Sequence, residues 1–446
     1  MNLHTLLRAR AAENRPLRVG LIGAGKFGAM FLSQALRTPG LHLLGVADLS
    51  PQRARSALKT AGWPAERIAA LSFAKALADG TTRVTEDALA LINAPGMDVV
   101  IEATGAPEAG IRHALACCER GRDVVMVNVE ADVLAGPLLA RRALEAGVVY
   151  SLAYGDQPAL ICEQVDWART CGFEVVAAGK GTLYMPHFHE STPDTVWAHY
   201  GLTPERAQDS GLNAKMFNSF LDGTKSAIEM AAVANATGLA PAPDGLAFPP
   251  CAVDKLAETL IPMSAGGVLH HKGQVEVVSS RNRDGSDIAG GLRWGVYVTF
   301  EAPSEYVERC FSDYGLITDR SGRYTALWRP YHLIGLELGV SVAHVGLLKM
   351  PTGVARAFNA DVAATAKRDL AAGEILDGEG GYTVWGRLVP AAASLAKRTL
   401  PIGLAHDLKL KRAVAKGQVV TWDDVDVPPD GLAVRIRREM ERAFAP

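Results

Sequence analysis

The first third of the chain alternates short apolar runs with segments whose apolar residues recur every three or four positions. The apolar runs cover residues 19–22, 41–47, 97–102 and 123–127, and a helical pattern at 29–36 follows the first of them. This alternation is typical of a parallel sheet that helices cover on both faces. We therefore predict an α/β fold with a doubly wound parallel sheet over residues 1–150.

The pattern changes beyond residue 150. Strands are predicted at 148–154, 173–179, 274–280 and 294–302, with a helix at 159–171. The later strands alternate apolar and polar residues, as in a sheet with one covered face. We expect an α+β domain over residues 151–360 that binds substrate and mediates oligomerisation.

The C-terminal part contains two similar turn-rich segments, 366–377 and 415–425. Each has a basic residue, then Gly followed by Glu or Gln, an apolar pair and an Asp. We expect a small β-rich domain over residues 361–446, with two related turns.

The first apolar run leads directly into Gly23-x-Gly25-x-x-Gly28. Between a strand and a helix, this spacing is the fingerprint of dinucleotide binding in a Rossmann fold. Gly23 permits a tight turn, Gly25 lets the backbone approach a pyrophosphate, and Gly28 lets the helix pack closely. The motif predicts an NAD(P) site that also includes Lys26 and Phe27, at a helix N-terminus that favours phosphate.

Other candidate cofactor residues follow the later strands. Asp48 ends the 41–47 run, where an acid favours the ribose hydroxyl of NAD, but Arg53 follows and could meet the 2′-phosphate of NADP. The residues alone leave this choice open. Thr104 and Gly105 form a small-residue turn suited to a nicotinamide ring, and Asn128 follows the 123–127 run.

Composition narrows the class of protein. The chain has 446 residues, of which 48% are hydrophobic and 21% charged, and its formal net charge is −2. Such a balance fits a globular protein and argues against nucleic acid as a partner. No apolar run has the length of a membrane span, and the six cysteines show no zinc spacing. We expect a cytoplasmic protein without nucleic-acid or membrane partners, and a homo-oligomer by base rate.

Asp222 and Lys225 are the first candidates for catalysis. Reduction of a carbonyl needs a proton donor, and Lys225 opens an otherwise apolar helix. Spacing of three places Asp222 on the same side of the helix start, where it could hold the ammonium group. The alternative is an N-cap Asp beside a solvated Lys.

Carboxylates at two turns are candidates for acid–base catalysis and metal binding. Glu130 lies in Asn-Val-Glu after the 123–127 run, and Asp156 lies in Gly-Asp-Gln-Pro. Both offer the oxygen ligands that Mg²⁺ or Mn²⁺ prefers, and Glu130 could also move a proton. Turn capping is the alternative for each.

Candidate substrate residues are basic. His187 and His189, expected on a strand, would share one face, where metal binding is the alternative to substrate contact. Lys180 lies between two glycines. The tract 320–332 is dense in Arg, Ser, Tyr and His, and its candidates are Arg320, Ser321, Arg329 and His332. Arginine binds phosphate or carboxylate well, but salt bridges with a structural role are the alternative for each arginine.

Four motifs give residues 15–240 a resemblance to homoserine dehydrogenase. Besides the glycine motif, Tyr154-Gly-Asp-Gln-Pro158 falls on the Gly-Gly-x-Pro turn of that family, and 176–182 falls on its Asn-Gly-Thr segment. Asp222 to Gly238 falls on its Asp…Lys helix, which implies that Lys225 donates the proton with Asp222 as partner. The chain departs from the family at Val129, where the family has a lysine, and at Lys180, where it has an asparagine.

The C-terminal segments 367–374, 400–403 and 416–421 resemble a SAF domain, a small β-clip domain. A body like homoserine dehydrogenase with a SAF tail resembles the bacterial 1-deoxy-D-xylulose 5-phosphate reductoisomerase-like family. The resemblance implies synthesis of 2-C-methyl-D-erythritol 4-phosphate for isoprenoids from a small phosphorylated sugar, with NADPH and a divalent metal. An ordinary dehydrogenase of a semialdehyde or sugar acid and a non-catalytic dinucleotide sensor remain as alternatives.

Overall fold

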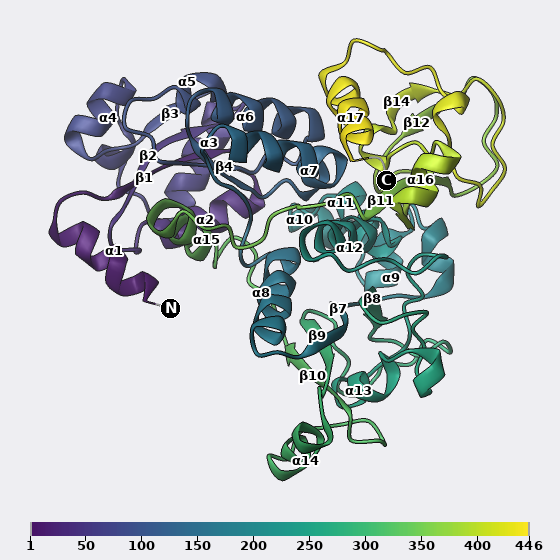
Figure 1. Cartoon of the computed structure of the whole chain (residues 1–446). Helices are drawn as coiled ribbons and strands as arrows, with labels where there is room; N and C mark the ends of the chain where they lie inside the picture. The colour runs from purple at the N-terminus through teal and green to yellow at the C-terminus, as the bar shows by residue number, and fades with distance from the viewer. Residues whose placement is uncertain (1, 445–446) are drawn as a thin grey trace. The chain divides into compact units, whose positions relative to one another are not determined.

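The computed structural model describes residues 2–444, and its chain forms two compact units (Figure 1). The first contains the chain up to Leu160 together with His332–Arg356, and the second contains Ile161–Tyr331 and the chain from Ala357 on. The segment 332–356, which the sequence patterns place in a middle domain, thus belongs with the N-terminal unit. The expected boundaries at 150 and 360 stay a prediction.

A six-stranded parallel sheet forms the centre of the first unit, in the order β3-β2-β1-β4-β5-β6. Its strands are β1 (Leu17–Ile22), β2 (Leu41–Ala47), β3 (Arg83–Thr85), β4 (Val99–Glu102), β5 (Asp123–Met126) and β6 (Tyr150–Leu152). This is the strand order of the Rossmann fold, in which ligands bind at the carboxyl ends of the strands where the order reverses. The predicted doubly wound sheet is confirmed.

Helices connect these strands and cover the sheet (Figure 1). They are α1 (Leu3–Ala12), α2 (Lys26–Ala35), α3 (Pro51–Thr60), α4 (Phe73–Asp79), α5 (Ala88–Ile92), α6 (Pro107–Glu119), α7 (Val129–Glu145) and α15 (Gly339–Ala343). Helix α2 packs against α3 and α15, whereas α6 packs against α5 and α7. Most residues of these strands are apolar because both sides of the sheet are buried.

A mixed four-stranded sheet forms one part of the second unit, in the order β10-β9-β7-β8. Its strands are β7 (Glu174–Thr182), β8 (Gln274–Ser279), β9 (Val296–Glu301) and β10 (Tyr324–Arg329). Strand β7 runs parallel to β8 and antiparallel to β9. The helices of this region are α8 (Gln157–Thr170), which crosses the boundary at Leu160, α9 (Val196–Tyr200), α10 (Pro204–Asp209), α11 (Ala214–Leu221), α12 (Thr224–Thr237), α13 (Leu256–Thr259) and α14 (Glu305–Asp313).

Helix α12 is the central helix of the second unit. It packs against β7 and β8 and also against β11 and β13 from the C-terminal part of the chain. Most of its residues are buried, which explains why its sequence is largely apolar, and the buried polar residues include Glu229 and Asn235. The C-terminal part therefore belongs to the same core as the helix that begins with Thr224 and Lys225.

The C-terminal part contains two antiparallel strand pairs and two helices. They are β11 (Ala360–Ala366) with β13 (Val384–Pro390), β12 (Ile375–Asp377) with β14 (His406–Lys409), α16 (Ala391–Lys397) and α17 (Leu432–Ala443). The two similar turn-rich segments lie beside one another, since the N–H of Ala366 donates to the carbonyl oxygen of Gln418 and the N–H of Gly417 donates to that of Ala366. A small β-rich region is thus present, and its likeness to a SAF domain stays a prediction.

Within residues 2–444, the structure contains no helix with the length and apolar character to cross a membrane. The cytoplasmic location and the homo-oligomer stay predictions.

Candidate functional site

The dinucleotide motif forms the turn between β1 and α2. Gly23 has a φ of +95°, and a Cβ there would lie 2.5 Å from the carbonyl oxygen of Ala103. A Cβ on Gly28 would lie 2.5 Å from the carbonyl oxygen of Gly23, whereas a Cβ on Gly25 would have no atom within 4 Å. Gly23 and Gly28 are therefore required by the turn itself. Gly25 leaves open space at the N-terminus of α2, as close approach of a pyrophosphate requires.

Lys26 and Phe27 are the first two residues of α2. Their backbone N–H groups belong to the helix N-terminus, which favours an anion. The loop as a whole fits the dinucleotide that its sequence predicts, and when bound the cofactor would lie against this turn.

Asp48, at the end of β2, is buried and has several donors. Its carboxylate accepts the N–H groups of Ala24 and Ser50, each at 2.8 Å, and contacts Nη2 of Arg53 at 2.7 Å. Burial raises the pKa of this carboxyl, but the bonds from Ser50, Ala24 and Arg53 together hold it below its usual value. The side chain of Arg53 is 59% exposed. Asp48 is thus already engaged, while Arg53 presents its guanidinium group at the surface.

Thr104, Gly105 and Asn128 lie at the carboxyl edge of the sheet. The Thr104 hydroxyl donates to Glu102 at 2.5 Å, and the Asn128 side-chain amide donates to Thr104 at 3.3 Å. Asn128 also accepts the Ala131 N–H at 3.1 Å and so caps α7. Gly105 has a φ of +70°. Asn128 thus caps the N-terminus of α7, and its bond to the Thr104 hydroxyl positions that side chain.

Sequence analysis missed Glu102, the last residue of β4. Its side chain is fully buried, and one oxygen contacts Thr104 and also Nδ1 of His113 at 3.2 Å. The other oxygen, Oε2, has no hydrogen-bond partner among residues 2–444. A glutamate in a run of valines and isoleucines was the signal that could have found it.

Glu130 and Asp156 lie in the first unit, at the starts of α7 and α8. Glu130 is in the first turn of α7, and Oδ1 of Asp156 accepts the N–H of Gln157 at 2.9 Å. Among the described residues, no group of three or more His, Cys, Asp or Glu side chains is arranged to hold a metal ion. The side chains of the chain therefore do not by themselves form the expected metal site, and we derive no step through a metal.

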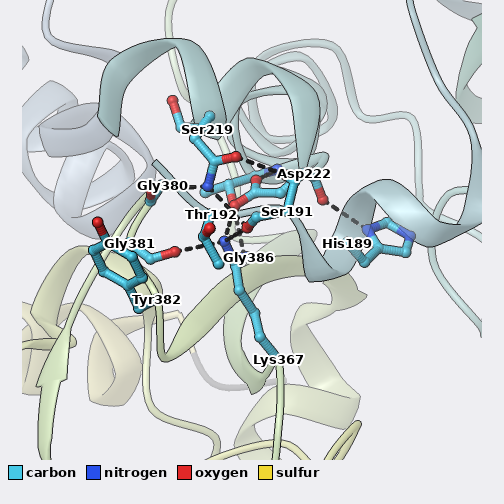
Figure 2. A network of polar contacts seen from close by, with 12 residues as sticks. His189, Ser191, Thr192, Ser219, Asp222, Lys367, Gly380, Gly381, Tyr382 and Gly386 are labelled. Atoms are coloured by element: carbon cyan, nitrogen blue, oxygen red, sulfur yellow. Dashed lines mark hydrogen bonds and ion pairs between the residues drawn. The ribbon is translucent and has the colours of Figure 1, made fainter. Parts of the chain in front are cut away.

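In the second unit, Asp222 is the centre of a buried polar network (Figure 2). Its Oδ1 accepts the N–H of Thr224 at 2.9 Å, and its Oδ2 lies 2.7 Å from Nζ of Lys367. The second contact is an ion pair rather than a well-aligned hydrogen bond. Lys367 Nζ also donates to the carbonyl oxygens of Ser191 at 2.8 Å and Gly381 at 2.7 Å. Its ammonium group is therefore well supplied with acceptors.

Sequence analysis did not identify Lys367 as a candidate functional residue. It belongs to the first of the two similar C-terminal segments, and no local pattern links it to Asp222. Asp222 caps the end of α11, and Gly223, with a φ of +91°, leads into α12. The network thus fixes the turn that precedes Lys225.

Lys225 is the second residue of α12 and is half-buried. The carboxylate of Asp222 contacts the Thr224 N–H and Lys367, which the spacing argument did not foresee. The pairing of Asp222 with Lys225 and the role of Lys225 as proton donor stay predictions.

The strand expected for His187 and His189 is wrong, because Pro186–Glu190 forms the 3₁₀ turn η2. Pro186 favours such a turn start and cannot donate to a sheet. The two rings do not share a face as a strand would require. His189 contacts Asp222 O at 2.6 Å through Nδ1 and the Tyr184 hydroxyl at 2.9 Å through Nε2, and its ring stacks on Trp385.

These contacts define the tautomer of His189. A carbonyl oxygen can only accept, so Nδ1 carries the proton and Nε2 accepts from Tyr184. Burial lowers the pKa of this ring, although its contact with Asp222 partly opposes the shift. His189 is therefore neutral near pH 7, and His187 instead lines a pocket formed by residues 183–201 and 281–293.

The other candidate substrate residues are not brought into one cluster. Lys180, on β7, forms a buried ion pair with Glu229 of α12. Arg320 and Ser321 lie on an exposed turn, where the Ser321 hydroxyl bonds Asp319 at 2.6 Å. Arg329 ends β10, and its guanidinium group lies 5.6 Å from the ring of Tyr331. His332 belongs to the first unit. Contact of any of them with substrate stays a prediction.

A scan against protein families matches residues 155–338 to the family described as "Oxidoreductase DRL, catalytic domain". A search of curated proteins gives no match. Among solved structures, a myo-inositol dehydrogenase from Lactobacillus casei in complex with NAD(H) and myo-inositol is 18% identical. That alignment covers 41% of this chain and 50% of the other, with a TM-score of 0.28.

A biliverdin reductase from Synechocystis, in complex with biliverdin and NADP⁺, is 19% identical, covering 43% of this chain and 55% of the other with a TM-score of 0.27. The alignments span about half the length of these structures, and TM-scores this low do not support a conclusion about function. Residues 155–338 thus resemble an oxidoreductase catalytic domain, and the first unit has the Rossmann strand order and a dinucleotide-binding motif after β1.

Proposed function

We propose that this protein is an NADPH-dependent reductoisomerase that converts 1-deoxy-D-xylulose 5-phosphate to 2-C-methyl-D-erythritol 4-phosphate. The observation that carries the proposal is the match of residues 155–338 to the DRL catalytic domain. The matched range contains β7 to β10, the Asp222 turn and the Lys225 helix. The sequence resemblance to the reductoisomerase-like family rests on motifs in the same region and in the C-terminal part.

The contacts of Asp48 support NADPH as the cofactor. An acid at the end of β2 selects NAD when it is free to bind the ribose hydroxyls. Here the carboxylate already accepts the Ala24 and Ser50 N–H groups and holds Arg53. The exposed guanidinium group of Arg53 is suited to a 2′-phosphate.

Lys225 is the proposed proton donor to the alkoxide that forms when the carbonyl is reduced. When bound, the reduced cofactor supplies the hydride. The ion pair of Asp222 and Lys367 and the capping bond to Thr224 fix the start of the helix that bears Lys225. Glu130, at the N-terminus of α7, is the proposed group for moving the hydroxyl protons of the substrate.

Product analysis tests the proposal. The purified full chain is incubated with NADPH and 1-deoxy-D-xylulose 5-phosphate, with Mn²⁺ and then with a chelator, and the product is examined by ¹³C NMR. The proposal predicts oxidation of NADPH and a product with a branched carbon skeleton. A reduced product with the unbranched skeleton would replace the proposal with an ordinary dehydrogenase, and NADPH binding without any reduction would also contradict it.

A further inference from the structure

The second unit contains a pocket of about 480 Å³ that lies outside the Asp222 network. Two parts of the chain form it, and both lie within this unit. It is lined by Leu183, Met185, His187, Phe188, Ala198, His199, Tyr200, Gly201, Arg281, Asp284, Gly285 and Arg293. A volume of this size suits a small metabolite.

Four of the lining side chains are hydrogen-bond donors without an acceptor. Within residues 2–444, no hydrogen bond is made by the rings of His187 and His199, the hydroxyl of Tyr200 or the guanidinium group of Arg293. The two rings lie 5.7 Å apart, and the Arg293 guanidinium group lies 4.9 Å from the ring of Trp294. Lys367 in the Asp222 network, by comparison, has its acceptors supplied by the chain.

The protonation of these groups suits an anion. Burial raises the pKa of Tyr200 to about 12, so its hydroxyl keeps its proton at neutral pH and can donate. Burial lowers the pKa of His199, and the neighbouring His187 lowers it further, whereas a negative charge bound beside His199 would favour its protonated form.

Of the other charged lining groups, Arg281 has an acidic partner, whereas Asp284 accepts hydrogen bonds only at Oδ1 and forms no ion pair within residues 2–444. Nε of Arg281 donates to Asp287 at 3.0 Å, and Oδ1 of Asp284 accepts the N–H of Ser286 at 2.9 Å and its hydroxyl at 2.6 Å. The pocket therefore has an excess of free donors over free acceptors, the arrangement that a phosphate with several acceptor oxygens satisfies.

The pocket shares a segment of chain with the Asp222 network. Leu183, Met185 and His187 line the pocket, whereas Tyr184 and His189 belong to the chain of contacts that reaches Asp222. A molecule held in the pocket would therefore contact the segment that also positions the turn before Lys225.

We propose that this pocket binds the phosphate group of a phosphorylated sugar substrate, with Arg293, His187, His199 and Tyr200 as donors. The inference rests on the proposed function and adds the residues that recognise the phosphate. Lys180 is a weaker candidate because Glu229 neutralises it, and Arg320 and Ser321 are weaker because their turn is exposed.

Binding of inorganic phosphate to the full chain, followed by ³¹P NMR, tests this pocket without requiring turnover. Arg293→Gln should weaken phosphate binding about tenfold or more, since a hydrogen-bonded charge is lost. Tyr200→Phe removes one hydroxyl group and should weaken binding by a smaller factor. Arg309→Gln, on α14 of the same unit, serves as the control because its guanidinium group lies against Tyr306 and outside the pocket.

The outcomes separate the pocket from the proposed function. Phosphate binding that falls in Arg293→Gln and Tyr200→Phe but not in Arg309→Gln supports the pocket, even if 1-deoxy-D-xylulose 5-phosphate is not turned over. No phosphate binding by the wild type, or equal binding by the folded Arg293→Gln and Tyr200→Phe variants, would overturn it. If the enzyme is active, Arg293→Gln should raise the KM for the sugar phosphate and leave the KM for NADPH unchanged.

Discussion

The ammonium group of Lys367 lies 2.7 Å from the carboxylate of Asp222, and the two side chains are 2% and 0% exposed. This buried pair joins the C-terminal part of the chain to the turn before α12 (Figure 2). Two buried charges are stable only when each has a partner, so removing one leaves the other unpaired. The C-terminal region is therefore part of what holds the candidate catalytic helix in place.

Lys367→Met should lower the free energy of unfolding by about 3–5 kcal/mol, the usual cost of leaving one buried charge unpaired. Urea denaturation gives the measurement. Lys416→Met is the matched control, because Lys416 belongs to the same C-terminal part and pairs with Glu190 at side chains that are 53% and 56% exposed. Its loss should cost about 0–1 kcal/mol. Equal losses of unfolding free energy in the two variants would show that the buried pair of Asp222 and Lys367 stabilises the fold no more than an exposed ion pair does.

The glycine motif predicts two different defects. Gly25→Ala should fold normally, because its φ of −70° suits alanine and the added Cβ has no atom within 4 Å, but it should weaken dinucleotide binding about tenfold or more. Gly23→Ala should destabilise the fold, because a Cβ meets the backbone of Ala103. Thermal unfolding and NADPH fluorescence titration measure the two effects. Tight NADPH binding by Gly25→Ala would contradict the assignment of the loop.

Cofactor choice should depend on Arg53. Arg53→Gln should weaken NADPH binding about tenfold or more and leave NADH binding nearly unchanged, since only NADPH has a 2′-phosphate. Arg55→Gln is the control on the same helix, because Nη1 of Arg55 donates to the carbonyl oxygen of Ile68. Titration of each variant with both cofactors gives the result. A parallel loss of NADH and NADPH affinity in Arg53→Gln would mean that Arg53 acts by holding Asp48.

The fold of the first unit could be predicted because its signals are local. The strand at 41–47 has the predicted bounds, and Gly23, Gly25 and Gly28 lie in the predicted turn. Each depends on residues within one strand–turn–helix unit. The same residues leave the choice between NAD and NADP open, because the sequence does not show which donors the Asp48 carboxylate accepts.

The site of the second unit was harder to predict because its contacts join distant segments. Asp222 and Lys367 meet through the packing of β11 and β13 on α12, which no periodicity reveals. The segment that begins at Pro186 was predicted as a strand but forms a 3₁₀ turn. The predicted direction of the His189 side chain was wrong for the same reason. Residues 332–356 likewise belong to the first unit through tertiary packing, which the pattern of apolar and polar residues does not show.

Asp132 makes stability depend on pH. Its side chain is fully buried in α7, the Tyr150 hydroxyl donates to it at 2.9 Å, and burial raises its pKa from 3.8 to about 7. The folded state thus binds a proton more tightly than the unfolded state does. The contribution to stability is complete below the unfolded pKa and is lost as pH rises to the folded pKa, at up to about 1.4 kcal/mol per pH unit.

Asp132→Asn should remove this dependence because asparagine does not titrate. The unfolding free energies of wild type and Asp132→Asn are measured from pH 5 to pH 8. The value for the variant minus the value for wild type should increase as pH rises toward about 7 and should then stay constant. Taking the difference cancels the other buried carboxyl with a raised pKa, Glu276. A difference that is constant with pH would contradict the raised pKa of Asp132.

The rate of NADPH oxidation with 1-deoxy-D-xylulose 5-phosphate, measured for wild type and Lys225→Gln, tests the central claim most directly. Lys255→Gln, with a side chain 54% exposed in the same unit, is the control. We predict oxidation by wild type and by Lys255→Gln, and a loss of about 10²- to 10⁴-fold in Lys225→Gln with NADPH binding retained. Oxidation by Lys225→Gln at the wild-type rate would contradict the role of Lys225, and no oxidation by a wild type that binds NADPH would contradict the proposed reaction.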